Sequence, residues 1–179
     1  MTEAKQDLTV TRPGARAARH RNGKKAALTP RLSKLVAQVS RITQHTFNAA
    51  ASSVFLLDKA DGELVFKFAS GQVGHQLKGA RLGKQYGIAG WVTHNGEPLL
   101  VNDVKRDRRF DEIVDTVTGF KTKSVMCAPL VAGRKVIGVI EVLNKLDGTG
   151  FGEGDLETLV SIAYLTSLSI DNARAAKAR

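Results

Sequence analysis

The chain has 179 residues, of which 42% are hydrophobic and 25% are charged, as is typical of one globular domain with a packed core. No apolar run reaches the roughly 18–20 residues of a membrane helix, and the N-terminus lacks the apolar stretch of a secretory signal, so we expect a cytoplasmic protein without membrane contact. The single cysteine, Cys127, excludes an internal disulfide, a cysteine-based zinc site and a dithiol redox cycle within one chain.

The net charge of +10 is unevenly distributed along the chain. Residues 1–28 carry seven Lys/Arg and two Asp/Glu, which is half of the excess in about a sixth of the chain. A short basic segment with few apolar residues cannot offset its ordering entropy, so we expect a disordered tail. Such a tail either binds nucleic acid or an acidic protein by charge, or only keeps the protein soluble.

The first predicted helix runs to about Asn48. Thr29 suits the N-cap and Pro30 the first helical position. Apolar residues then recur at three- and four-residue spacing, as on one face of an amphipathic helix.

Two β-prone runs follow, at 52–58 and 63–71, and Asp61-Gly62 between them is a strong hairpin signal. Residues 71–86 hold several glycines and predict a loop.

Residues 87–96 predict a short helix that ends at an Asn-Gly pair, and 98–103 predict a brief strand. Residues 107–120 predict a polar loop with one helical stretch. A second hairpin joins 123–133 to 135–145.

The last predicted helix covers about 153–176, and its apolar stripe is unusually broad. One side is expected to lie on the sheet, and the other against the first helix or a second subunit. The stripe comprises Leu156, Leu159, Val160, Ala163, Ser167 and Ile170, widened by Ile162, Leu165 and Leu168.

Hairpins dominate this order of elements, and no βαβ rhythm is present. The pattern therefore predicts an α+β fold, with an antiparallel sheet and helices on both faces.

The familiar catalytic patterns are missing from the sequence. It contains no phosphate-binding G-x-x-x-x-G-K-[ST], no G-x-S-x-G elbow and no H-E-x-x-H, and its four histidines form no metal pair. The mixed acidic and basic residues of 103–115 are typical of a solvated salt-bridge surface. We therefore expect a protein that is not an enzyme and that binds neither a cofactor nor a metal ion.

From about residue 29 to the end, the chain resembles a GAF domain, a small-molecule-sensing relative of the PAS fold. The resemblance rests on the order and spacing of SVFLLD, GIAGWV, LLVNDVKRDRRF, TGFKTKSVMCAPL and KVIGVIEVLNK. It implies a GAF/PAS-like sheet whose N- and C-terminal helices pack together, in a domain over 29–179 that follows the tail.

The segment Asn144-Lys145…Phe151-x-x-x-Asp155 is similar to the N-K…F-x-x-x-D-E signature of GAF domains of the cyclic-nucleotide-phosphodiesterase type. Leu156 stands where that signature ends in Glu. A carboxylate in the first helical turn could accept a charge-assisted bond from Lys145. In the family these four residues support the ligand pocket from a distance, and a plain structural brace between sheet and helix is equally compatible with the pattern.

The resemblance also implies a ligand pocket on the sheet under the middle segments. Its candidate lining is Ser53, Ala69, Ser70, Ile88, Ala89, Asp103 and Thr118. The helix start at GIAG presents backbone N–H groups that suit an anion such as phosphate. Ala69 and Ser70 replace the aromatic and acidic residues that cyclic-GMP binders often carry, which weakens a cyclic-nucleotide assignment.

Three functions follow from these observations. The first is a stand-alone sensor that binds a small molecule, such as a cyclic nucleotide, and signals through its terminal helices. The same helices are expected to form a homodimer. The second is an interaction protein that uses the basic tail on a GAF scaffold. The third, reduction of free methionine sulfoxide as in some short GAF proteins, requires a resolving thiol that this chain lacks.

Overall fold

The computed structural model describes residues 28–71 and 74–175. Nearly all of the predicted tail lies outside these residues. Within the described part, no helix is long and apolar enough to cross a membrane.

One six-stranded antiparallel sheet forms the centre of the fold, in the order β3-β2-β1-β6-β5-β4. The antiparallel pairing confirms the predicted fold class. The strands are β1 (Ala49–Leu57), β2 (Leu64–Ala69), β3 (Arg81–Leu82), β4 (Leu99–Val101), β5 (Val125–Ala132) and β6 (Lys135–Lys145).

The two predicted hairpins lie side by side, because β6 pairs with both β1 and β5. Gly138 permits this close pairing, since a Cβ there would lie 2.1 Å from the carbonyl oxygen of Phe55. The hairpin turns form at Gly62 and Gly133, both with positive φ, as the sequence predicts.

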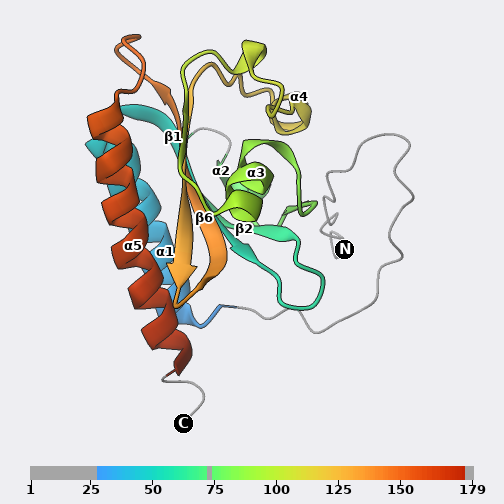
Figure 1. The fold of residues 1–179 in the computed structure, drawn as a ribbon, viewed down its shortest axis with the longest axis vertical. Helices are drawn as coiled ribbons and strands as arrows, with labels where there is room; N and C mark the ends of the chain where they lie inside the picture. The colour runs from blue at the N-terminus through green and yellow to red at the C-terminus, as the bar shows by residue number, and fades with distance from the viewer. Residues whose placement is uncertain (1–27, 72–73, 176–179) are drawn as a thin grey trace, which may run out of the picture.

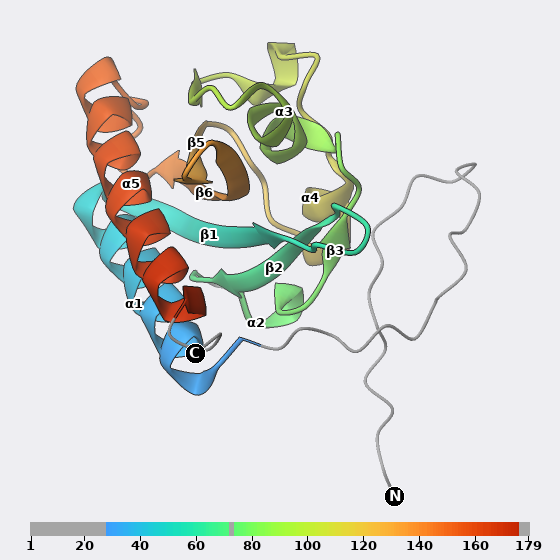
Figure 2. The same ribbon diagram turned by 60° about the horizontal axis from the view of Figure 1, so that its bottom comes forward.

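The terminal helices α1 (Pro30–Thr46) and α5 (Glu153–Ala175) pack together against one face of the sheet (Figures 1 and 2). The predicted N-cap of α1 is present, because the Thr29 hydroxyl accepts from the Leu32 N–H at 3.3 Å.

The other face is covered by the middle of the chain, in which α3 and α4 lie over the sheet (Figure 1). These shorter elements are α2 (Gly74–Leu77), α3 (Gly87–Asn95), the 3-10 turn η1 (Val104–Arg106) and α4 (Ile113–Thr118). The predicted loop over 71–86 is thus wrong in part, because α2 and β3 lie within it. Both are too short to give a periodic pattern.

The sheet separates two hydrophobic clusters. One lies under α1 and α5 and includes Val36, Ile140 and Leu159, each completely buried. The other lies under the middle segments and includes Phe55, Phe66 and the residues of α3 that face the sheet.

The broad stripe of α5 is only half covered by the protein itself. Leu159, Ala163 and Ile170 are buried, as predicted. Val160 and the residues that widen the stripe on its outer side, Leu165 and Leu168, are instead exposed, because they point away from the sheet.

Candidate ligand-binding site

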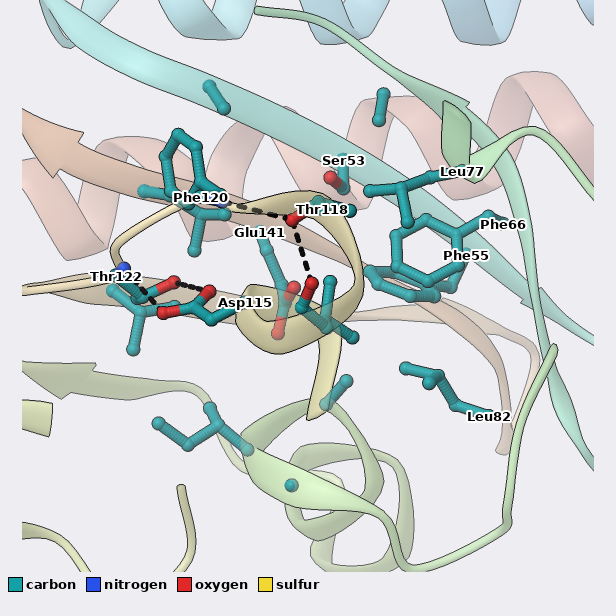
Figure 3. Close-up of a pocket in the computed structure, with 18 of the residues that line it drawn as sticks. Ser53, Phe55, Phe66, Leu77, Leu82, Asp115, Thr118, Phe120, Thr122 and Glu141 are labelled. Carbon is teal, nitrogen blue, oxygen red and sulfur yellow. Dashed lines mark hydrogen bonds between the residues drawn. The ribbon is translucent and has the colours of Figure 1, made fainter. Parts of the chain in front are cut away.

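A cavity of about 80 Å³ lies between the sheet and the middle segments (Figure 3). The sheet supplies one wall from β1, β2, β3, β5 and β6, and α2, α3, α4 and their loops supply the other. Its lining is Ala51, Ser53, Phe55, Phe66, Ala69, Ser70, Leu77, Leu82, Tyr86, Gly87, Ile88, Ala89, Phe110, Asp111, Val114, Asp115, Thr118, Phe120, Thr122, Val125, Glu141 and Leu143.

The structure brings six of the seven candidate pocket residues together around this cavity. They are Ser53, Ala69, Ser70, Ile88, Ala89 and Thr118. Their contact with a ligand stays a prediction.

Asp103 is not part of the lining. Strand β4 ends at Val101, so Asp103 lies at the start of η1, with its side chain 57% exposed. There it forms an ion pair with Arg106 at 3.2 Å. This arrangement fits the predicted salt-bridge surface better than a pocket wall.

Glu141 is the lining residue of greatest chemical interest that sequence reasoning missed. In β6 it lies opposite Ser53 of β1 on one side and Cys127 of β5 on the other. Burial raises the pKa of the Glu141 carboxyl to about 7, although its contact with the Cys127 thiol acts in the opposite direction. The signal was an acid within the apolar run GVIEVL, on the strand face that Val139 also occupies.

Cys127 shows the opposite of a reactive microenvironment. Its side chain is completely buried, and burial together with Glu141 raises the pKa of the thiol well above its usual value. The thiol is therefore protonated near neutral pH and suits packing rather than nucleophilic chemistry.

The segment between α4 and β5 forms one side of the cavity and is held by its own hydrogen bonds (Figure 3). The Asp115 carboxylate accepts from the Thr122 N–H at 2.6 Å and from its hydroxyl at 2.7 Å. The Thr118 hydroxyl donates to the Val114 carbonyl and accepts from the Phe120 N–H. These bonds connect the segment to α4.

Helix α3 is positioned by close backbone packing and by a stacked arginine. A Cβ on Gly90 would lie 2.4 Å from the carbonyl carbon of Gln85, so this position requires glycine. The Arg109 guanidinium lies 4.8 Å from the centre of the Trp91 ring and pairs with Asp107 at 2.6 Å. The loop before α4 is thereby attached to α3.

The four candidate supporting residues form a corner between β6 and α5. The predicted ion pair is present, with Lys145 Nζ 2.9 Å from Asp155 Oδ2, and that oxygen also accepts from the Gly152 N–H. Phe151 is buried, and both of its backbone polar groups bond to the Asn102 side chain.

Asn144 connects this corner to the wall of the cavity. With φ at 56°, it directs its side chain at the segment before β5. The side-chain oxygen accepts from the N–H groups of Lys123 and Ser124, and the side-chain amide donates to the Lys121 carbonyl.

Comparison with known proteins assigns the fold and the family. A family model of the GAF domain matches residues 31–170. The chain is 30% identical over 149 residues to a probable 3',5'-cyclic phosphodiesterase of Caenorhabditis elegans, an alignment that covers 78% of this chain and 20% of that protein. It is also 37% identical over 89 residues to the dual 3',5'-cyclic-AMP and -GMP phosphodiesterase 11 of Drosophila melanogaster, covering 49% of this chain and 6% of that protein. The chain thus spans a small part of these relatives.

Solved structures agree on the fold. The GAF domain of a phosphoenolpyruvate-protein phosphotransferase from Coxiella burnetii has a TM-score of 0.75 at 22% identity, covering 84% of this chain and 89% of that one. A free methionine-R-sulfoxide reductase from Neisseria meningitidis has a TM-score of 0.68 at 20% identity, covering 81% of each chain. The chain belongs to the GAF domain family, a family of small-molecule sensory and regulatory domains.

Proposed function

We propose that this GAF domain is a sensor that binds a small organic molecule in the cavity and transmits its occupancy through the terminal helices. The observation that supports this most directly is the cavity itself, whose second wall is built from short, loop-rich elements. Such elements can close around a ligand more easily than the sheet can deform.

A physical route from cavity to helix supports the signalling step. Strand β6 carries Glu141 in the cavity wall, and its neighbour Ile140 lies on the other face of the sheet in one hydrophobic cluster with Leu159 of α5. Asn144 holds the segment that leads back to α4. A ligand that favours one position of that segment would bias the packing of α5 by its differential affinity.

We further propose that the output is carried by a homodimer formed through α1 and α5. Val160, Tyr164 and Leu168 recur at four-residue spacing on α5 and are between 38% and 61% exposed, and Leu165 lies beside them at 62%. Ile42 of α1 adds a further exposed apolar side chain to the same helical layer. A second copy would present the same surface and cover these residues by symmetry.

Filling the cavity tests the sensor proposal. Ala69→Trp places a large side chain at the cavity wall, and Ala60→Trp places it in the exposed turn between β1 and β2 as a matched control. The probes are cyclic GMP, cyclic AMP and the low-molecular-mass filtrate of a cell lysate. At least one should raise the melting temperature of the unmodified protein and of Ala60→Trp but not of Ala69→Trp. A shift that survives in Ala69→Trp, or no shift at all, would count against the cavity as the ligand site.

A further inference from the structure

The ionisable side chains among the described lining residues are acidic apart from Tyr86. Three carboxyl groups line it, from Asp111 before α4, Asp115 within α4 and Glu141 in β6. No lysine, arginine or histidine is among the described lining residues. An anion entering this space would lie beside the carboxyl groups of Asp115 and Glu141, with no cation among the described lining residues to offset the repulsion.

The hydroxyl groups of the lining are mostly committed as donors to the protein. Ser70 donates to the Ser52 carbonyl, Thr118 to the Val114 carbonyl and Thr122 to Asp115. These oxygens can still accept, but their protons are not free for a ligand. A ligand that forms a hydrogen bond with one of these oxygens must therefore be the donor.

Ser53 is the exception among the lining serines and threonines. It is 3% exposed, and its hydroxyl makes no hydrogen bond among the described residues. Its strand position is directly opposite Glu141, and both side chains are drawn in the cavity in Figure 3. The Ser53 hydroxyl can accept a hydrogen bond from a donor group of a ligand, and the neighbouring Glu141 carboxylate can accept from the same group.

The N-terminus of α3 is the feature of the cavity that favours an anion, and it has an acidic neighbour. A Cβ on Gly87 would lie 3.9 Å from the Cβ of Asp111, which places that side chain close to the first turn of the helix. A carboxylate at this position competes with any ligand anion for the positive end of the helix.

The apolar part of the lining is rich in aromatic rings. Phe55 and Phe66 are in contact, with ring centres 3.9 Å apart, and Phe110 and Phe120 lie on the opposite wall. Aromatic faces attract cations and pack well against flat apolar groups.

From these observations we propose that the cavity selects an organic cation, an amine or amidine carried on a compact apolar body, whose charged group donates to Glu141 and Ser53. This assignment rests on the proposed sensor function and specifies its ligand class. It disfavours cyclic nucleotides as ligands, because they would bring a negative phosphate close to Asp115 and Glu141.

Binding should then depend on pH. The Cys127 thiol of β5 and the Ser53 hydroxyl of β1 lie beside Glu141 in the sheet, and the other titratable groups of the described lining are Asp111, Asp115 and Tyr86. A cation binds the ionised carboxylate, and the pKa of Glu141 is about 7 without ligand. Affinity for a permanently charged cation should therefore rise as the pH increases through 7, and the cation should lower the pKa of Glu141.

A set of three probes with one shape and different charge tests the proposal on the full chain. Benzamidinium, benzamide and benzoate carry a positive, a zero and a negative charge on the same ring. Binding is followed by the fluorescence of Trp91, the single tryptophan, which lies in α3, and by thermal shift. We expect benzamidinium to bind at least about tenfold more tightly than benzoate, with benzamide between them.

The variant Glu141→Gln removes the charge with little change in shape, and Glu157→Gln on the exposed side of α5 is its control. The first should weaken benzamidinium binding about tenfold or more and remove its pH dependence, whereas the second should change neither. If Glu141→Gln does not fold, the ranking of the three probes on the unmodified protein still decides.

Binding of benzoate or cyclic GMP as tightly as benzamidinium would overturn the cation assignment and leave the sensor function standing. Absence of binding by all three probes, while the purified protein retains an acidic or uncharged small molecule, would also overturn the cation assignment and leave the sensor function standing. Absence of binding together with no retained molecule would contradict both proposals.

Discussion

Lys145 at the end of β6 donates to Asp155 in the first turn of α5, with 2.9 Å between Nζ and Oδ2. The pair fixes the corner where the sheet passes into the helix. The Gly152 N–H and the Lys145 ammonium lower the pKa of Asp155 below its usual value of 3.8. The ionised carboxylate therefore stabilises the fold at pH values above 3.8, and this contribution is lost as the pH falls through the lowered pKa.

Lys145→Ala should lower the melting temperature by a few degrees and leave ligand affinity unchanged, because the ion pair is partly exposed and makes no contact with the cavity lining. Thermal unfolding and a binding titration measure the two effects. Lys135→Ala, at the exposed start of the same strand, is the control. A loss of affinity in Lys145→Ala alone would show that the corner acts on the ligand rather than only as a brace.

Asn144→Ala should destabilise the domain by about 1–3 kcal/mol, because it removes three hydrogen bonds to the segment before β5 and leaves alanine at φ 56°. Asn144→Gly loses the same bonds but adopts this φ without strain, so its loss should be smaller. Denaturant unfolding of the two variants separates bonding from backbone conformation. Equal losses would mean that the positive φ carries no cost here.

Cys127 should react with iodoacetamide far more slowly in the folded protein than in denaturant, because the thiol is buried and its pKa is raised. The rate is measured by intact mass at mildly alkaline pH. Cys127→Ser should keep every ligand-binding activity of the protein. Fast labelling of the native chain, or loss of ligand binding in Cys127→Ser, would contradict the structural role.

Glu141 predicts an unusual pH dependence of stability. The raised pKa means that the folded protein binds the proton more tightly than the unfolded chain does, so the free energy of unfolding should fall as the pH rises from 4.5 to 7. The lowered pKa values of Asp58, Asp107 and Asp155 act at more acidic pH and leave this window to Glu141. Urea titrations across the window should show the fall in the unmodified protein, and a much smaller fall in Glu141→Gln. Identical slopes would argue that the carboxyl is well solvated.

The larger elements of this fold could be predicted from the sequence because each carries its own period and its own end signals. Thr29-Pro30 predicts the start of α1, and Gly133 predicts the second hairpin turn. The exposed outer half of the α5 stripe could not be predicted, since apolar spacing does not show which side of a broad stripe meets the sheet. Leu165 and Leu168 follow the pattern and still face outward.

The cavity was predicted in part. Six candidate positions line it because their place in the family pattern fixes their strand or helix. Asp103 lies outside because its neighbourhood is a surface turn held by an ion pair. Glu141 was missed because one acid in an apolar strand has no recognisable motif, and only the packing of β1, β5 and α4 around it gives the carboxyl its environment.

Native mass spectrometry of the protein purified from cells tests the central claim most directly, since it reports both bound small molecules and subunit number. We expect a dimer in which the unmodified protein carries an additional small mass, and that mass should be absent from Ala69→Trp. A bare mass for the unmodified protein, or the same added mass on both proteins, would contradict the assignment of the cavity as the ligand site.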